Sequence, residues 1–460
     1  MIHRLLTASR AISFYSRHVC DIEAPEKRST GFLAKTWVDS TMRFIHAADI
    51  HLGRQFSGLN RSSPELGKLF LQAGYSAWDR IVGRALEFKV DFVTLGGDIF
   101  DASNPSVRPR VAFREGVARL READIPVYAV LGNHDPFRTF PDSLRSLPGL
   151  FLFGPEPETK ELTRGAILHG VSFENSAVKE NLARRIRRVA GSDLAIGLLH
   201  TNVSGNSDHG DYAPCSLDDL RAAGMDVWCL GHVHSPTVLL EEPLVLYSGS
   251  AQGAHVKEIG PRGCHLVSIE DNWTATSEFL PTAAVRWEAL DLDVTGCACP
   301  EDLLDVTELA CAEFVSGLTE LDAVVARICL KGKPSMQNIG SLAQDDEFRS
   351  LLAERLANLS VPVFPEALCD CVSLARELDL SPEGEGFLSD FLRLANESVE
   401  ASDLRSALAD RIREELGKLN RKYYEAVFDS ESWKENPRLT AEYVKQASEM
   451  VLRMFMEPRS

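Results

Sequence analysis

Eight side chains in five short motifs of the sequence are of the types that bind divalent metal ions. Aspartate, asparagine and neutral histidine are donors that hard and borderline cations accept. Two cations held close together neutralise a phosphate ester and activate a water molecule, which is the chemistry of phosphate ester cleavage. The leading interpretation is therefore an enzyme with a two-metal site. In chain order the eight residues are Asp49, His51, Asp98, Asn133, His134, His200, His232 and His234.

Each motif, taken alone, has a simpler interpretation. Asp49 could cap the next segment, and Asp98 could form a turn. His200, alone at the end of an apolar run, would more often be a buried core histidine. The pair His232 and His234 is the most specific motif. A single site is favoured because four of the five motifs close an apolar, strand-like run.

The elements that must position these residues are strands separated by helices. Short, near-continuous apolar runs bounded by glycine predict strands that are buried on both faces. Alternation of strands and helices predicts a layered α/β domain, in which ligands bind beyond the carboxyl ends of the strands. The motifs can therefore converge. Strands are predicted at 44–48, 90–95, 126–131, 194–199 and 226–230, with helices at about 64–88 and 107–122.

The spacing within the motifs suggests how the donors are shared between two ions. Asp98 follows two glycines and is the candidate for a short carboxylate that bridges both ions. Asp49 and His51 are two residues apart, so in an extended segment both can face one ion. His232 and His234 have the same spacing but could serve different ions. Because histidine donors soften the site, Mn²⁺, Fe²⁺ or Zn²⁺ is expected before Mg²⁺.

Asn133 and His134 are consecutive, so their side chains point apart in an extended turn and should have different roles. We assign Asn133 as a ligand and His134 as the acid that protonates the leaving oxygen, with Asp135 as a candidate to orient it. Three residues in loops after strand ends are candidates for contacts with a phosphate backbone, although both arginines could equally be solvated charges. These are Arg54, Asn104 and Arg138.

The chain is long enough for several domains. A break at 281–286 precedes a different pattern, and the segment 381–386 reads as a linker. Apolar stripes at 404–419 and 439–456 are candidates for docking a partner or for packing on their own domain. The predicted organisation is a disordered extension at 1–41, a catalytic domain at 42–285, a small α+β capping domain at 286–380 and a helical C-terminal region at 387–460.

The composition limits the classes of partner. The formal net charge of the 460 residues is -18, whereas a protein that simply coats DNA would be basic. A nuclease remains compatible with this charge, because bound cations or a basic partner can supply local positive charge. The ten cysteines show no spacing typical of zinc, which favours reduced thiols in a cytoplasmic protein. No apolar stretch approaches the length of a membrane span.

The five motifs, in this order, resemble those of the calcineurin-like metallophosphoesterase family. The family pattern is Asp-x-His, Gly-Asp, Gly-Asn-His-Asp/Glu, His and Gly-His-x-His, and all five parts occur between residues 43 and 287. The resemblance implies a layered sandwich of mixed sheets flanked by helices. It implies that His134 is the transition-state acid. It also implies that Asp49, His51, Asp98 and His234 hold one metal ion, and that Asp98, Asn133, His200 and His232 hold the other.

Within the family the chain most resembles SbcD-type DNA repair exonucleases of the bacterial YhaO branch. The resemblance rests on segments 44–53, 97–101, 202–215 and 247–264, with Ser248 where such chains often have proline. It implies a DNA substrate, an SbcC-like coiled-coil ATPase docked on the C-terminal helices, and a homodimer formed through 64–88. The protein phosphatase branch usually continues its Gly-Asp motif with Asp-Arg-Gly, whereas Asp101 is followed here by alanine and serine.

Two alternative functions stay open at this point. One is a metallophosphoesterase for a small nucleotide or a lipid phosphate ester, which a deep pocket would favour over an open cleft. The other is a non-catalytic scaffold of the same fold, which would be free to lose ligands, although none is missing.

Overall fold

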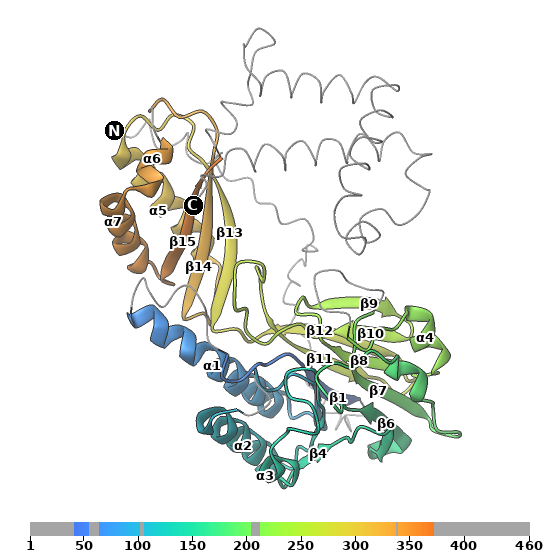
Figure 1. Ribbon diagram of the computed structural model, residues 1–460. Coiled ribbons are helices and arrows are strands. Elements are labelled where there is room, and N and C mark those ends of the chain that lie inside the picture. The colour runs from blue at the N-terminus through green and yellow to red at the C-terminus, as the bar shows by residue number, and fades with distance from the viewer. Residues whose placement is uncertain (1–40, 55–63, 102–104, 204–211, 337–338, 372–460) are drawn as a thin grey trace, which may run out of the picture. The chain divides into compact units, whose positions relative to one another are not determined.

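The computed structural model describes residues 41–54, 64–101, 105–203, 212–336 and 339–371 (Figure 1). Its contacts divide the chain into two units, and the elements that carry the motifs belong to the one that comprises Met1–Leu330 and Ser341–Cys369. The predicted helical region at 387–460, and the predicted extension except for residue 41, lie outside the described residues. Among the described helices, none has the length and apolar character needed to cross a membrane.

The first sheet has six strands in the order β12-β11-β1-β2-β3-β4. Strands β1 to β4 run parallel, while β11 pairs antiparallel with β1 and with β12. Strands β1, β2 and β3 are almost wholly buried, as their continuous apolar sequences predict. The strands are β1 (Met42–Ala47), β2 (Phe92–Gly96), β3 (Val127–Val130), β4 (Leu150–Leu152), β11 (Gly263–Ile269) and β12 (Ala275–Pro281).

The second sheet also has six strands, in the order β5-β6-β7-β8-β10-β9. Its four central strands are parallel, and each edge strand pairs antiparallel with its neighbour. Strands β7 and β8 are buried along their whole length. The strands are β5 (Glu158–Glu161), β6 (Ala166–Val171), β7 (Leu194–His200), β8 (Val227–Gly231), β9 (Thr237–Glu241) and β10 (Leu244–Tyr247).

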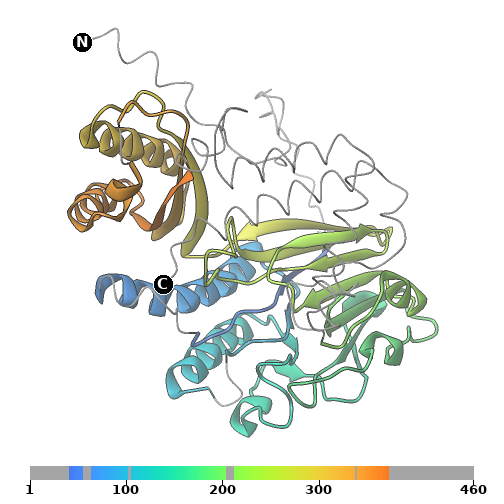
Figure 2. The same cartoon turned by 45° about the horizontal axis from the view of Figure 1, so that its top comes forward.

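The two sheets pack face to face and are covered by helices on their outer faces. A cluster that includes Phe44, Phe92 and Leu198 fills the space between the sheets. The first sheet is covered by α1 (Pro64–Phe88) and α2 (Val107–Glu122), which lie side by side in Figure 1. The second is covered by α4 (Leu217–Ala222) and the short helix η4 (Leu182–Arg185), and Figure 2 gives a second view of these layers. The predicted layered sandwich of mixed sheets flanked by helices is confirmed.

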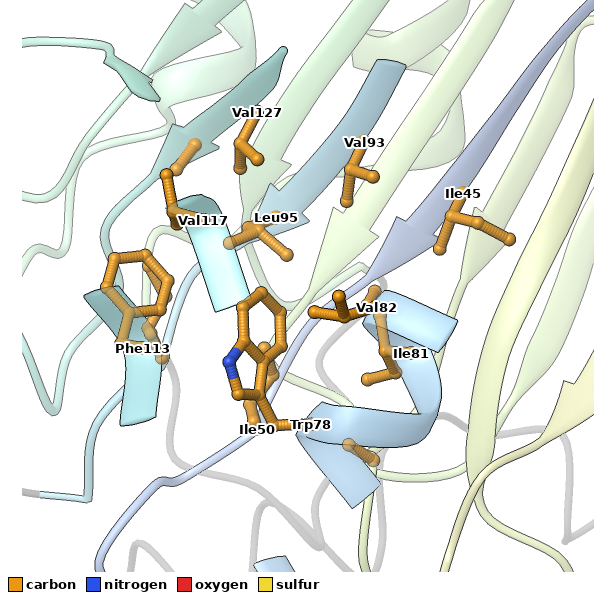
Figure 3. Packing of buried hydrophobic residues seen from close by; sticks show 14 of the residues in the cluster. Ile45, Ile50, Trp78, Ile81, Val82, Val93, Leu95, Phe113, Val117 and Val127 are labelled. Carbon is orange, nitrogen blue, oxygen red and sulfur yellow. The ribbon is translucent and has the colours of Figure 1, made fainter. Parts of the chain in front are cut away.

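Trp78 on α1 is central to the packing between the first sheet and its two helices (Figure 3). Its side chain is 2% exposed, and its ring centroid lies 5.5 Å from that of Phe113 on α2. Its indole nitrogen donates a hydrogen bond to the carbonyl oxygen of Ala112 at 3.1 Å. A Cβ atom at Gly116 would lie 2.3 Å from that nitrogen, so only glycine lets α2 approach α1 this closely.

We expect Trp78→Ala to lower the free energy of unfolding by about 3–5 kcal/mol, because it removes a large buried side chain and leaves a cavity. Urea denaturation followed by circular dichroism measures the change. The control is Val107→Ala, at a side chain that is 76% exposed, where a change within about 0.5 kcal/mol is expected. Equal unfolding midpoints for the two variants would contradict this assignment of the core.

A smaller, three-stranded sheet follows β12, in the order β13-β14-β15. This part combines strands and helices, as expected for the predicted small α+β domain. The predicted domain bounds themselves stay a prediction. The elements are β13 (Val285–Asp293), α5 (Pro300–Ser316), β14 (Ala323–Lys331), α6 (Ile339–Gln344), α7 (Asp346–Ala357) and β15 (Val363–Asp370).

The smaller elements and the thiols complete the described structure. The remaining short helices are α3 (Asp142–Arg145) and η3 (Thr163–Gly165). All nine cysteines among the described residues are free thiols, and Cys229 is buried, whereas Cys329 is half-buried. The predicted reduced thiols are therefore compatible with the structure.

Candidate metal centre

All five motifs lie at the carboxyl ends of parallel strands. Three of them follow β1, β2 and β3, which are neighbours in the first sheet, and two follow β7 and β8, which are neighbours in the second. Because the sheets pack face to face, these ends meet at one edge of the sandwich. The convergence predicted from the sequence is therefore observed.

The two sheets approach each other very closely at this edge. A Cβ atom at Gly231, the last residue of β8, would lie 2.1 Å from the carbonyl oxygen of Gly96, the last residue of β2. A Cβ atom at Gly96 would in turn lie 2.9 Å from the Cβ atom of Ala48. Only glycine fits at these two positions, so main-chain contact sets the distance between the two groups of strand ends.

The backbone at several motif residues is left-handed. Asp49, His51 and Asp98 each have a φ of 49°, and His232 has a φ of 104°. The extended conformation expected around Asp49 and His51 is therefore wrong, although both side chains still reach the site. Hydrogen bonds hold the turn, since the amide of Asp49 donates to Gly97 and that of His51 donates to the carbonyl of Asp98, both at 3.0 Å. Such strained backbone is concentrated at functional sites.

Asp49, His51 and His234 form the first group of converging donors. The Nε2 atoms of His51 and His234 lie 3.2 Å apart. The Nε2 atom of His234 also lies 3.9 Å from the Oδ1 atom of Asp49. Asp49 and His51 are almost fully buried, so their donor atoms are held by the protein and not by solvent.

The second group of donors is built around His200. Asp49, Asp98 and His200 bring their donor atoms together. The Nε2 atom of His200 lies 3.1 Å from Oδ1 of Asn133, and its ring centroid lies 5.2 Å from that of His232. The Nδ1 atom of His200 donates to the carbonyl oxygen of Gly96 at 2.9 Å, a bond that leaves Nε2 free to face the site.

Asp98 lies between the two groups. Its Oδ2 atom is 3.9 Å from Nε2 of His51 and 3.6 Å from Nε2 of His200. Its Oδ1 atom accepts a hydrogen bond from the amide of His134 at 2.9 Å. Burial opposes ionisation of this carboxyl group, but the neighbouring histidines, His200 first, hold the pKa of Asp98 below its ordinary value. An ionised carboxylate in this position is suited to bridging two cations.

The donor set fits a pair of divalent cations. Two imidazole Nε2 atoms that face each other at 3.2 Å, beside buried carboxylates, are donors that a cation would satisfy together. Among the residues that the structure describes, the buried Nδ1 atom of His51 has no hydrogen-bond partner. Burial lowers the pKa of His51 well below its ordinary value, which favours the neutral form that binds metals. The candidate site is therefore a dimetal site with aspartate and histidine donors.

His134 differs from the candidate ligands in its exposure, since its side chain is 42% exposed. Its Nδ1 atom contacts the carbonyl oxygen of Asp101 at 3.1 Å, and its Nε2 atom lies 4.0 Å from Oδ2 of Asp98. Asp101 was not among the residues chosen from the sequence, although it lies only three residues after Asp98. A partly exposed imidazole beside the donors is well placed to meet a substrate.

The carboxylate of Asp135 takes hydrogen bonds from the main chain. It accepts from the amides of Ile99 at 2.7 Å, Phe100 at 3.2 Å and Gly132 at 3.0 Å. Burial, and then the charge of Asp98, raise the pKa of Asp135 to about 7. Asp135 therefore joins the segments that follow β2 and β3, and its role in orienting His134 stays a prediction.

The candidate substrate contacts differ in their surroundings. Arg54 lies between two carboxylates, with its Nε atom 3.8 Å from Asp101 and its NH1 atom 3.7 Å from Glu258. Arg138 is 70% exposed and lies 3.4 Å from Glu174. Asn104 lies outside the described residues. Contacts of these three residues with a substrate stay predictions.

Glu258 is a second residue that the sequence analysis did not select as part of the site. It is 5% exposed and belongs to the loop between β10 and β11. Its Oε1 atom lies 2.6 Å from Nδ1 of His234. Burial disfavours ionisation of this carboxyl group, but its hydrogen bond with His234 outweighs that effect and lowers the pKa of Glu258 to about 2. No regular spacing links residues 234 and 258, so only the fold reveals this pair.

Fold and site together define a calcineurin-like metallophosphoesterase domain. Residues 42–236 match the family described as calcineurin-like phosphoesterase. The chain is 35% identical over 260 residues to the protein of Bacillus subtilis (strain 168) named uncharacterized metallophosphoesterase YhaO, a match that covers 55% of this chain and 64% of that protein.

More distant similarity links the chain to DNA double-strand break repair proteins named Mre11. The protein from Sulfurisphaera tokodaii is 24% identical over 237 residues, which cover 47% of this chain and 59% of that protein. The protein from Haloferax volcanii is 28% identical over 230 residues, which cover 49% of each chain. The chain thus spans about half to two thirds of the length of these curated relatives.

Proposed function

We propose that this protein is a metal-dependent hydrolase, a two-metal phosphodiesterase that acts on DNA as an exonuclease in repair or recombination. The observation that carries the proposal is the position of Asp98, whose Oδ2 atom lies between a histidine of each donor group. The Mre11 proteins among the relatives are named for DNA double-strand break repair, which supports DNA as the substrate. We also propose that the protein acts in the cytoplasm.

The family resemblance implies which of the chain's residues would bind the cations and which would transfer a proton. Asp49, His51, Asp98 and His234 would hold one cation, and Asp98, Asn133, His200 and His232 would hold the other. When bound, the cations supply Lewis acidity and lower the pKa of a water molecule. His134 would donate a proton to the leaving sugar oxygen, and its contact with the carbonyl oxygen of Asp101 would hold its ring in place.

The exposure of His134 favours a large substrate over a small one. The proposed acid is 42% exposed, so a phosphate presented at the surface can reach it without entering an enclosed pocket. A small nucleotide or lipid phosphate ester is the second candidate substrate, and the net charge of -18 is the observation that favours it.

Manganese is our proposed native metal, because nitrogen donors from several histidines join the carboxylates and make the site softer than an all-oxygen cage. We also keep two proposed partners: an SbcC-like coiled-coil ATPase on the C-terminal helices, and a second copy of the chain at α1. The predicted C-terminal helices lie outside the described residues. Light scattering that shows a monomer at high concentration would count against the homodimer.

We expect the purified protein to release nucleotides from end-labelled linear DNA in the presence of Mn²⁺ and to leave closed circular DNA intact. An exonuclease needs an end, whereas an endonuclease would nick the circle. The products are resolved on a denaturing gel, with a chelator added to one arm as the control. Hydrolysis of small phosphodiesters with no cleavage of any DNA would support the second candidate and contradict the first.

A further inference from the structure

The His234–Glu258 pair has the arrangement by which proteins orient a metal-binding histidine. A carboxylate on one ring nitrogen fixes the tautomer, so that the other nitrogen presents its lone pair to the metal. Glu258 occupies the Nδ1 side of His234 at 2.6 Å, and Nε2 faces Asp49 and His51. The second carboxylate oxygen of Glu258 accepts a hydrogen bond from the amide of Ala254 at 2.6 Å. Both oxygens are thus engaged and the carboxylate cannot rotate freely.

Arg54 connects Glu258 to a second carboxylate, that of Asp101, which lies near a histidine but forms no hydrogen bond with it. Its guanidinium group lies 3.7 Å from Glu258 and 3.8 Å from Asp101. The Oδ1 atom of Asp101 lies 3.5 Å from Nδ1 of His51. Arg54 therefore balances two buried or half-buried carboxylates, each of which faces the distal nitrogen of a histidine in the first donor group.

In the second donor group, His200 is supported differently. The distal nitrogen of His200 contacts a backbone carbonyl oxygen, that of Gly96, instead of a carboxylate. A carboxylate makes an imidazole a stronger donor than a neutral carbonyl does, because its negative charge stabilises the positive charge that metal binding places on the ring. The two metal positions should therefore differ in affinity, and the difference should depend on residues that touch neither ion.

The loop that carries Glu258 is held by contacts that do not involve its carboxylate. Arg262, which is 4% exposed, donates to the carbonyl oxygens of His234 at 2.8 Å and Ile259 at 3.0 Å. The side chain of Gln252 donates to Val285 at 2.6 Å and accepts from the amide of Ala284 at 2.9 Å. Variants at Glu258 should therefore keep the loop and the fold.

We propose that Glu258 and Arg54 are positioning residues that strengthen binding of one of the two metal ions, the one held by His51 and His234, with little effect on the other. The inference rests on the proposed two-metal site, but it does not depend on DNA as the substrate. It also gives Arg54 a different role from contact with a phosphate backbone.

The test is a manganese titration of the full chain, followed by calorimetry and by electron paramagnetic resonance, without any nucleic acid. Wild-type protein should bind two ions and give the spectrum of a coupled pair. Glu258→Ala should lower the affinity for one ion by about 10–100-fold. At intermediate Mn²⁺ concentrations this variant should give the spectrum of a single, uncoupled ion. Glu258→Gln, which keeps the shape of the side chain, should give a smaller loss, and Arg54→Gln should weaken the same ion.

Two controls separate positioning from a general loss of structure. Glu366→Ala removes a carboxylate that is paired with Arg327 in the three-stranded sheet, and both ions should bind as in wild type. Asn133→Ala should weaken the other ion. Equal weakening of both ions in Glu258→Gln, or no change in either, would overturn the inference. If metal binding responds as expected but no DNA is cleaved, only the proposed substrate fails.

Discussion

Replacing Asp98 by alanine is expected to empty both metal positions and to abolish hydrolysis. The Oδ2 atom of this residue lies within 4 Å of a histidine from each donor group, at 3.9 Å from His51 and 3.6 Å from His200. Its loss would remove a donor from both ions and the negative charge that lets them lie close together. A pair of cations contributes several kcal/mol of transition-state stabilisation, so turnover should fall about a thousandfold or more.

Elemental analysis after dialysis measures the metal content of the Asp98 variant, and nucleotide release from linear DNA measures its activity. Asp226→Ala is a suitable control, because Asp226 also accepts a hydrogen bond from a main-chain amide, that of Ala195 in β7. Unlike Asp98, it pairs with Arg188, away from the metal donors. The control should retain two ions. Unchanged metal content in Asp98→Ala would refute the bridging role.

Replacing His134 by alanine is expected to lower turnover on DNA by about 10²–10⁴-fold while both ions stay bound. The imidazole is the most exposed of the eight motif side chains, and its ring contacts the carbonyl oxygen of Asp101. We propose that His134 protonates the leaving oxygen. Turnover should fall without it, because an unprotonated sugar alkoxide is a poor leaving group.

A substrate with a good leaving group separates acid catalysis from metal binding. A bis(p-nitrophenyl) phosphate ester releases a stable phenolate that needs no proton, so His134→Ala should hydrolyse it nearly as fast as wild type does. Metal content should match that of wild type. Equal loss on both substrates would mean that His134 does not act as the acid, and full activity on DNA would contradict any catalytic role.

Much of the fold could be predicted because its central strands are short, apolar and closed by glycine. The bounds predicted for the helices at 64–88 and 107–122 agree with α1 and α2. Prediction failed for strands whose partners are remote, such as β11, which pairs with β1 from more than two hundred residues away. The local sequence of β11 does not predict that pairing, because the pairing is favourable only within the completed sheet.

The candidate donors could be selected from the sequence, because metal binding restricts which residue types can serve. The residues that hold the donors in place are not restricted in this way. Any carboxylate that reaches the distal nitrogen of His234 would serve, and Glu258 reaches it from a loop 24 residues away. The left-handed backbone at Asp49 was also not predictable, since aspartate has no strong preference for it. Contacts between segments impose that conformation, such as the hydrogen bond that the amide of Asp49 donates to the carbonyl oxygen of Gly97.

The close approach of Gly96 and Gly231 makes the site sensitive to the interior of the sandwich. Each donor group takes residues from both sheets, so the spacing between donors within a group depends on the distance between the two sheets at that edge. Main-chain atoms that touch cannot be compressed, but a cavity or an oversized side chain between the sheets can tilt one layer against the other. Sequence changes deep in this core can therefore tune metal affinity, even though they lie far from every donor.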